Sequence, residues 1–258
     1  MPMRLLLFLA ALAMPVVAWQ SQRGAFGPTT GEVADRFPTL LSAAGWAFSV
    51  WSLIFLLDLV FAVWQWRPRQ SDDATLAAVR PAATLGFVLT AAWMPAFSQQ
   101  MFDLALAMIW AALGCVLACA IVLARDDAPR PGARAWAWLP LSLHAGWLSL
   151  AAFLNTAQVA VAYDWLPAAD MLGWSLWLVA ALAALLLLAN AAMRGNGAYA
   201  LVAVWGLVAV WRGQLAADLP GSETVATVAV ALALVLALQT LLLIRRGRRL
   251  RDRRRGPR

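Results

Sequence analysis

Apolar runs about as long as a bilayer is thick recur along this chain, and they constrain its fold more than any other feature. A membrane-spanning helix needs about 20 mainly apolar residues, with about 17 as a lower limit. This template finds eight segments, at about 3–19, 40–65, 81–98, 101–124, 135–160, 170–193, 197–212 and 224–244, of which the short segment 197–212 is the weakest match. Composition agrees, because 63% of the residues are hydrophobic and only 13% are charged, unlike a soluble domain. We therefore predict an all-α integral membrane protein, a bundle of about eight transmembrane helices.

The placement of arginine predicts the orientation of this bundle. The chain has no lysine, and nine of its twenty arginines lie in the tail 245–258. Short loops rich in positive charge stay on the cytoplasmic side. With the N-terminus inside, the inner loops carry Arg4, Arg67, Arg69, Arg80, Arg125, Arg130, Arg134 and Arg194, and the outer ones only Arg23, Arg36 and Arg212. We expect both termini in the cytoplasm and the bacterial inner membrane as the location, since outer-membrane proteins are mostly barrels.

The two ends of the chain and its longest outer loop suggest further roles. The Arg-rich tail 245–258 should attract anionic lipid headgroups by about 1 kcal/mol per residue near the surface. A nucleic-acid partner is not expected, because the charge is a terminal tag and not a binding face. Residues 1–19 leave a cleaved signal peptide open as an alternative to a first helix. The loop 20–39, rich in Gly, Pro and Thr, is a candidate lid over an outward-facing cavity.

Polar residues share one face in each of two predicted helices. One face carries His144, Trp147, Ala151, Asn155 and Gln158, and the other carries Trp51, Phe55, Asp58, Ala62 and Gln65. Both follow the 3.6-residue period of a helix, and both would be costly against lipid, so they should point into the bundle. At a rise of about 1.5 Å per residue, Asp58 and His144 reach similar depths and could meet as a proton-sensitive pair. A histidine that only packs and an axial ligand to haem iron remain alternatives.

Three tryptophans lie too deep for the interfacial belts that usually explain this residue in membranes. Trp51, Trp93 and Trp147 reach about the same level of helices two, three and five, and three indoles there could line a pocket for a flat, largely apolar ligand. Core packing is the rival interpretation. No catalytic site and no metal site is predicted, because the sequence has no nucleophile–base motif, ligand cluster or phosphate loop. Cys115 and Cys119, one helical turn apart, predict plain packing.

Three of the predicted helices carry short motifs: Trp147, Ala151, Leu154 and Asn155 in helix five, Gly45, Phe48 and Trp51 in helix two, and Leu89, Trp93 and Phe97 in helix three. These motifs resemble those of the TspO/MBR family, the tryptophan-rich sensory proteins related to the translocator protein. Leu143 and His144 stand where family members usually have Pro-Tyr, and Thr90 replaces a usual Asn. The resemblance covers about residues 1–165.

We expect the chain to have three parts. These are a five-helix TspO-like membrane unit at 1–165, three additional transmembrane helices within 166–244 and the Arg-rich cytoplasmic tail 245–258. The resemblance implies a ligand-binding sensory or regulatory protein that takes a porphyrin or a similar flat apolar molecule, with sterols less favoured. A homodimer is implied, no cofactor is required, and a bound porphyrin or haem would be the ligand. The expected ligand-binding residues are Trp51, Phe55, Thr90, Trp93, Phe97, His144, Trp147, Ala151 and Asn155.

Two other classes of function remain open. A small-molecule transporter usually has intramembrane charges or broken helices near the midplane. Asp58 is such a charge, and Pro95 could break helix three, whereas the absence of an evident internal repeat argues against transport. An enzyme that degrades porphyrin is the least favoured class.

Overall fold

The computed structural model describes residues 2–67, 70 and 72–255. Arg69 and Arg258, which contributed to the predicted orientation, lie outside the described residues. Within the basic tail, the side chains described are those of Arg245, Arg246 and Arg249. The helices are α1 (Pro2–Gln22), α2 (Thr30–Arg36), α3 (Val50–Trp64), α4 (Ala74–Ser98), α5 (Phe102–Arg125), α6 (Leu139–Ala162), α7 (Met171–Ala192), α8 (Gly197–Leu215) and α9 (Ser222–Arg255).

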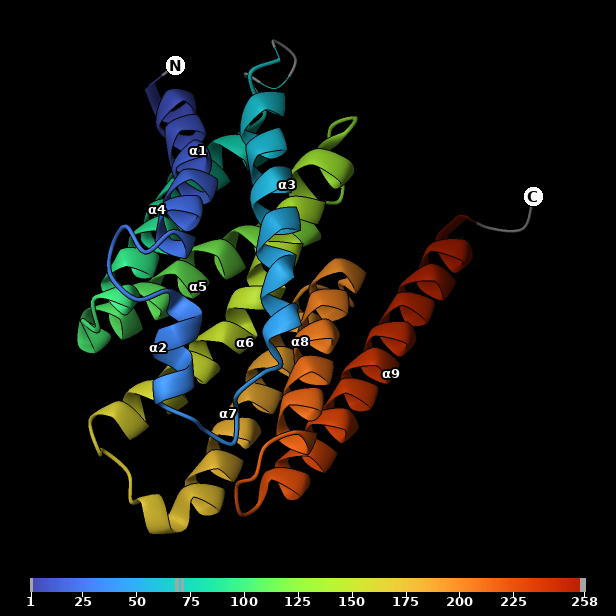
Figure 1. Cartoon of the computed structure of the whole chain (residues 1–258). Coiled ribbons are helices and arrows are strands. Elements are labelled where there is room, and N and C mark those ends of the chain that lie inside the picture. The colour runs from blue at the N-terminus through green and yellow to red at the C-terminus, as the bar shows by residue number, and fades with distance from the viewer. Residues whose placement is uncertain (1, 68–69, 71, 256–258) are drawn as a thin grey trace.

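Eight helices in the described part of the chain are long and apolar enough to cross a membrane. Their positions follow the eight predicted segments, so the prediction of an all-α membrane bundle is confirmed. Short helical turns precede three of them: the 3₁₀-helices η1 (Gly45–Ser49) and η4 (Ala168–Asp170) and the π-helical turn η3 (Arg134–Trp138). Figure 1 shows the N-terminus, the α3–α4 connection and the α5–α6 connection at the same end of the bundle.

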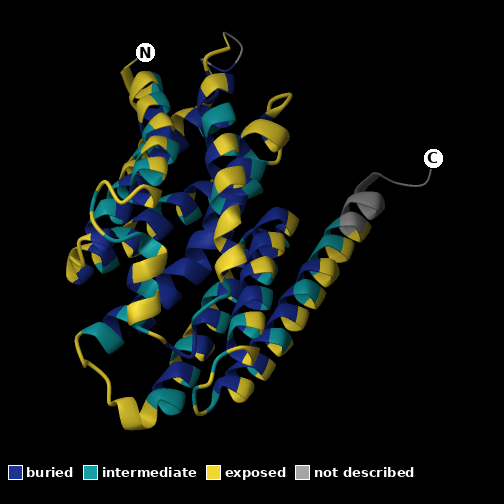
Figure 2. Cartoon of the chain, in the orientation of Figure 1, coloured by how far each residue is buried: buried dark blue, intermediate teal, exposed yellow. Residues whose placement is uncertain are grey.

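Helix α6 lies at the centre of the bundle. It packs against α3, α5, α7 and α8, whereas α1 packs on α3 and α4, and α9 packs on α7 and α8. Figure 2 shows α6 almost wholly buried, while the outer helices each expose one side. An exposed apolar side is the normal lipid-facing surface of a membrane helix. Because α6 has no lipid-facing side, polar groups on it can be held inside the protein.

Two glycines allow α8 to approach α6 closely. A Cβ at Gly146 of α6 would lie 2.5 Å from the backbone oxygen of Tyr199 in α8, and a Cβ at Gly206 of α8 would collide with Leu150 of α6. Small residues at helix interfaces are typical of membrane bundles, where association depends on close packing and not on hydrophobicity. Helix α8 therefore packs directly against the central helix α6.

The segment before α3 is also held by α8. The backbone N–H of Ala44 donates to the carbonyl of Ala209 at 2.9 Å, and the Gln214 amide donates to the carbonyls of Thr39 and Ser42 at 3.2 and 2.9 Å. The predicted second span began at residue 40, but helical structure begins only at Gly45. The difference arises because these apolar residues pair with α8 and do not continue α3.

Two further expectations about element boundaries were wrong. The loop 20–39 contains the helix α2, which a capping box defines, since Thr29 and Glu32 exchange side-chain and backbone hydrogen bonds. The predicted third span began at residue 81, yet α4 starts at Ala74, where Asp73 caps its N-terminus. Helix α4 also continues through Pro95 to Ser98, so the break considered for a transporter does not occur.

Candidate functional site

An aromatic cluster fills the space between α3, α4 and α6. The Trp51 ring stacks on Phe55 at 4.9 Å between centroids and meets His144 and Trp147 edge-on at 5.7 and 5.9 Å. Phe87 of α4 stacks on the His144 ring at 5.7 Å. We call these five residues the inner cluster. His144 and Trp147 are fully buried, so the helix faces that the sequence predicted to turn inward do turn inward.

Asp58 and His144 meet inside this cluster. Oδ2 of Asp58 lies 2.7 Å from Nδ1 of His144, and both side chains are inaccessible to solvent. On the other side of the ring, Nε2 of His144 lies 3.4 Å from the hydroxyl of Thr90. Three side chains from α3, α6 and α4 therefore form one chain of polar contacts across the interior.

We assign the protons of these three side chains from the hydrogen bonds that they make. The Thr90 hydroxyl donates its proton to the carbonyl of Gly86 at 2.8 Å, so its contact with His144 requires Nε2 to carry a proton and donate. One further proton then lies between Nδ1 of His144 and Oδ2 of Asp58. Whichever of the two atoms holds it, the pair carries no net charge. A net-neutral pair suits a site away from water, where an isolated charge is costly.

The connectivity of Asp58, His144 and Thr90 is that of a hydrolase triad, but the protons are arranged differently. A triad needs the imidazole to accept the hydroxyl proton. Here the proton of Thr90 is directed to the carbonyl of Gly86, and Nε2 of His144 is the donor. Thr90 is also buried, with 2% of its surface exposed. The arrangement is therefore suited to holding α3, α4 and α6 together and not to nucleophilic attack.

Trp93 belongs to a second cluster, nearer the loop 20–39. Its indole N–H donates to Oδ1 of Asn155 at 3.2 Å, and its ring stacks on Phe97 at 5.1 Å. Phe97 in turn meets Phe102, and Val33 of α2 packs into the same cluster. We call Trp93, Phe97, Phe102 and Val33 the outer cluster. The expected cage of three indoles is thus divided, because Trp51 and Trp147 are in contact while Trp93 pairs with Phe97.

Three buried polar atoms near these rings have no hydrogen-bond partner within the described residues. They are Nε1 of Trp147, Nδ2 of Asn155 and Oδ1 of Asp58. An unsatisfied buried donor or acceptor costs about 1–3 kcal/mol, and native interiors contain few of them. Ala151, which lies between Trp147 and Asn155 on the same face of α6, is buried and small. The face of α6 that carries Trp147, Ala151 and Asn155 therefore connects the two clusters. Two donors on this face, Nε1 of Trp147 and Nδ2 of Asn155, have no hydrogen-bond partner within the described residues.

Sequence reasoning did not include two side chains of this interior, Phe87 and Phe48, among the expected ligand-binding residues. Phe87 lies one helical turn before Thr90 on α4, a spacing that places both on one helix face, and its ring covers His144. Phe48 of η1 meets Trp147 edge-on at 5.6 Å. Cys119, expected to pack, is buried and donates weakly to the carbonyl of Val79. In the described part of the chain, no group of three or more His, Cys, Asp or Glu could hold a metal ion.

Fold and interior together define a class: an all-α integral membrane protein whose central helix is enclosed by its neighbours and carries buried aromatic and polar side chains. The chain belongs to the family of TSPO-like proteins, whose family model matches residues 4–242. This range includes α7, α8 and almost all of the apolar part of α9. No curated protein and no solved structure matches the chain significantly.

Proposed function

We propose that this TspO-type membrane protein is a ligand-binding sensor or regulator, and that a porphyrin or a similar flat, largely apolar molecule binds between α3, α4 and α6. The observation that carries the proposal is the set of unpartnered buried polar atoms on Asp58, Trp147 and Asn155 beside stacked aromatic rings. Family membership supports a TspO-type protein, and the ligand is our inference.

The chemistry of the interior suits such a molecule. A flat ring system can replace the contacts between Trp51 and Phe55, or between Trp93 and Phe97, with stacking of similar strength. Carboxylate or carbonyl groups on the ligand can accept from Nε1 of Trp147 and Nδ2 of Asn155, and a pyrrole N–H can donate to Oδ1 of Asp58. Binding would then give hydrogen-bond partners to three polar groups that destabilise the ligand-free state while they are unpaired.

Helix α2 offers a route of entry. Val33 is its one buried residue, and it packs over Phe97 and Phe102 of the outer cluster. A seven-residue helix with a single buried anchor opens at low cost, because local stability follows the apolar area that is buried. We therefore propose that α2 is the moving part of the lid expected at residues 20–39, and that its displacement would uncover Trp93.

Haem iron fits this interior less well than a metal-free porphyrin. Both ring nitrogens of His144 are occupied, Nδ1 by Asp58 and Nε2 by Thr90. An axial ligand needs one free imidazole nitrogen, so iron ligation would have to break one of these contacts. We therefore propose that no cofactor is required and that a porphyrin, when bound, is held by stacking and hydrogen bonds.

The first experiment is a titration of the detergent-purified protein with protoporphyrin IX, followed by the porphyrin absorption band and by quenching of tryptophan fluorescence. We expect saturable binding that is weakened several-fold by Trp51→Phe, Trp93→Phe or Trp147→Phe. Trp177→Phe is the matched control, because this indole on α7 is 78% exposed. Linear, non-saturating changes that are indifferent to all four substitutions would overturn the proposal.

One observation favours a transporter as a second candidate. Ionisable pairs inside a membrane often mark proton-coupled pathways, and Asp58 and His144 form such a pair. The unbroken course of α4 through Pro95 counts against it. Uptake of labelled porphyrin into proteoliposomes, lost in Asp58→Asn, would establish transport, whereas saturable binding without uptake would support the sensor.

The remaining expectations complete the proposal. We infer that the chain is not an enzyme, since Thr90 is not activated by His144. We infer an inner bacterial membrane with both termini in the cytoplasm, a homodimer, no nucleic-acid partner and contact of the basic tail with anionic lipid. Accessibility of single cysteines placed at residues 30 and 128 to a membrane-impermeant reagent tests the orientation, since residue 30 should react from outside.

A further inference from the structure

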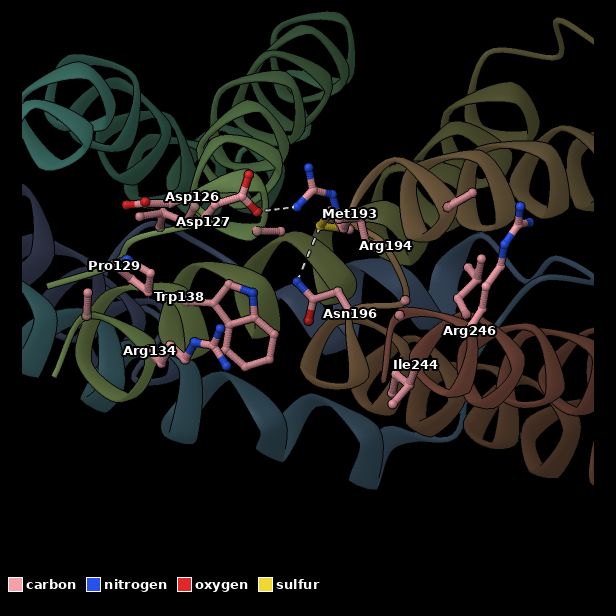
Figure 3. A pocket seen from close by; sticks show the side chains of 17 residues that line it. Asp126, Asp127, Pro129, Arg134, Trp138, Met193, Arg194, Asn196, Ile244 and Arg246 are labelled. Carbon is pink, nitrogen blue, oxygen red and sulfur yellow. Dashed lines mark hydrogen bonds and ion pairs between the residues drawn. The ribbon is translucent and has the colours of Figure 1, made fainter. Parts of the chain in front are cut away.

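A cleft of about 1170 Å³ opens at the end of the bundle that carries the basic loops. It lies where α5 ends, η3 leads into α6, α7 turns into α8 and α9 runs out towards the tail. Figure 3 shows Arg134 and Trp138 on one side, Ile244 and Arg246 on the other, and Met193, Arg194 and Asn196 between them. The cleft shares no residue with the inner or outer cluster, so it is a separate site.

The cleft has apolar walls and a rim of guanidinium groups. Leu123, Met193, Leu243 and Ile244 line it beside the indole of Trp138, and these residues lie at the ends of apolar spans, where hydrocarbon gives way to headgroups. Arg134, Arg194 and Arg246 lie at its margin. At this depth, the apolar walls could contact the acyl chains of an amphiphile, and the arginines at the rim could bind its anionic headgroup.

The ion pairs of the cleft leave two of these arginines available. Arg194 donates to Oδ1 of Asp127 at 2.6 Å and so neutralises that carboxylate, while Oδ1 of Asp126 accepts from the backbone N–H of Ala128. Arg134 and Arg246 make no ion pair with the carboxylates of described side chains. Guanidinium groups bind phosphate oxygens well, often through two hydrogen bonds at once.

Contacts within the protein hold the part of α9 that lines the cleft, so its position does not require a bound ligand. Gly195 has a φ of +82°, and a Cβ there would lie 2.8 Å from Cβ of Leu243, so the α7–α8 turn presses directly on α9. The Asn190 amide of α7 also donates to Gln239 and Thr240 of α9, at 2.8 and 2.9 Å. The cleft is therefore preformed.

We propose that this cleft binds one anionic phospholipid, with its phosphate between Arg134 and Arg246 and its acyl chains along α5 and α9. Its volume exceeds what a free phosphate needs and matches larger ligand pockets, which reach roughly 1,000 Å³. This site does not depend on the porphyrin site, and neither proposal needs the other.

The test compares two double variants of the full chain with equal loss of charge. R134Q/R246Q removes both cleft arginines, and R245Q/R249Q removes two exposed arginines of α9 that do not line the cleft. Native mass spectrometry in detergent measures retention of phosphatidylglycerol and of phosphatidylcholine with the same acyl chains. We expect the wild type and R245Q/R249Q to prefer phosphatidylglycerol, and R134Q/R246Q to lose that preference by on the order of tenfold.

Three results would overturn the proposal. These are a wild type that does not prefer phosphatidylglycerol, an equal loss in both double variants, and displacement of the lipid by millimolar glycerol phosphate, which would identify a soluble anion as the occupant. Hydrogen exchange of the wild type in nanodiscs provides a test that does not depend on folding of the variants. Phosphatidylglycerol should slow exchange at residues 126–134 and 193–197 relative to phosphatidylcholine, and equal exchange would contradict the site.

Discussion

Oδ2 of Asp58 on α3 lies 2.7 Å from Nδ1 of His144 on α6, with both side chains fully buried in the bundle. These residues are 86 positions apart in the chain, so the contact depends on the lateral order of the helices. With Thr90 it ties together the three helices that carry the aromatic interior. The assignment of one shared proton makes definite predictions for substitutions at either residue.

His144→Ala should destabilise the protein much more than Asp58→Asn. Removing the imidazole leaves a buried carboxyl group without its partner, and breaking a buried pair costs about 3–5 kcal/mol. Asparagine keeps the shape of Asp58, and its amide can donate to Nδ1 while Nε2 still donates to Thr90, so the loss should be about 1 kcal/mol. Thermal unfolding in detergent measures both.

The double variant D58N/H144A completes the comparison. Its destabilisation should be smaller than the sum of the two single effects, because neighbouring residues in one network are not additive. If Asp58→Asn were as damaging as His144→Ala, the neutral, proton-sharing assignment would be wrong and an obligatory charged pair would replace it.

Gly146→Ala should destabilise the contact between α6 and α8 by about 1–3 kcal/mol, the usual range for overpacking. The added methyl group meets the backbone oxygen of Tyr199, which cannot move aside, whereas at Gly206 it meets the flexible side chain of Leu150. Gly206→Ala should therefore cost less. Gly114→Ala is the control, since nothing lies within 4 Å of a Cβ there, and unfolding temperatures should rank the three in that order.

Helix α2 should loosen as the pH falls into the acid range. Hydrogen bonds with the backbone and side chain of Thr29 hold the pKa of Glu32 below its usual value of 4.5. A lowered pKa in the folded state stabilises the helix above the unfolded pKa, and that contribution is lost as the pH falls through the folded value. Hydrogen exchange in residues 32–36, corrected for intrinsic rates, should therefore accelerate below about pH 4.5.

Glu32→Gln is the control for this effect. Glutamine still completes a capping box but does not titrate, so exchange in α2 should become independent of pH over the same range. An unchanged pH response in this variant would show that another group controls α2.

A chain that ends after residue 165 should not fold into a stable five-helix unit. Truncation would uncover the face of α6 that α8 covers, including the close contact between Gly146 and Tyr199 and the hydrogen bond between Tyr199 and Ser149 at 2.9 Å. It would also release the segment 39–44 from α8. Size-exclusion profiles and unfolding temperatures of 1–165, alone and coexpressed with 166–258, measure the effect. A monodisperse, equally stable short chain would contradict it.

The spans were predictable because hydrophobic length is a local property of the sequence. The polar faces of α3 and α6 were predictable for a similar reason, since Asp58 and His144 follow a helical period and cannot face lipid. Helix α2 was also within reach, because Thr29 and Glu32 have the spacing of a capping box. The Gly and Pro residues around them favoured the prediction of a loop instead.

The lateral arrangement of the helices was not predictable from these patterns. The rise per residue predicts a similar depth for Trp93, Trp51 and Trp147, but depth does not determine which neighbour a ring meets, and Trp93 turns to Asn155 and Phe97. The cleft beside Arg134 and Arg246 combines three stretches that are far apart in sequence, 123–138, 191–196 and 243–247. Its existence depends on how α9 packs on the α7–α8 turn, which no periodicity encodes.

The neutrality of the Asp58–His144 pair has an electrical consequence. Voltage acts on charge, and moving one elementary charge through 100 mV changes the free energy by about 2.3 kcal/mol. Because the pair shares one proton and has no net charge, a joint shift of α3 and α6 moves no net charge at this pair. The membrane potential therefore does not change the free energy of that shift through the pair. The affinity of this interior for a ligand should therefore be the same in energised and de-energised membranes.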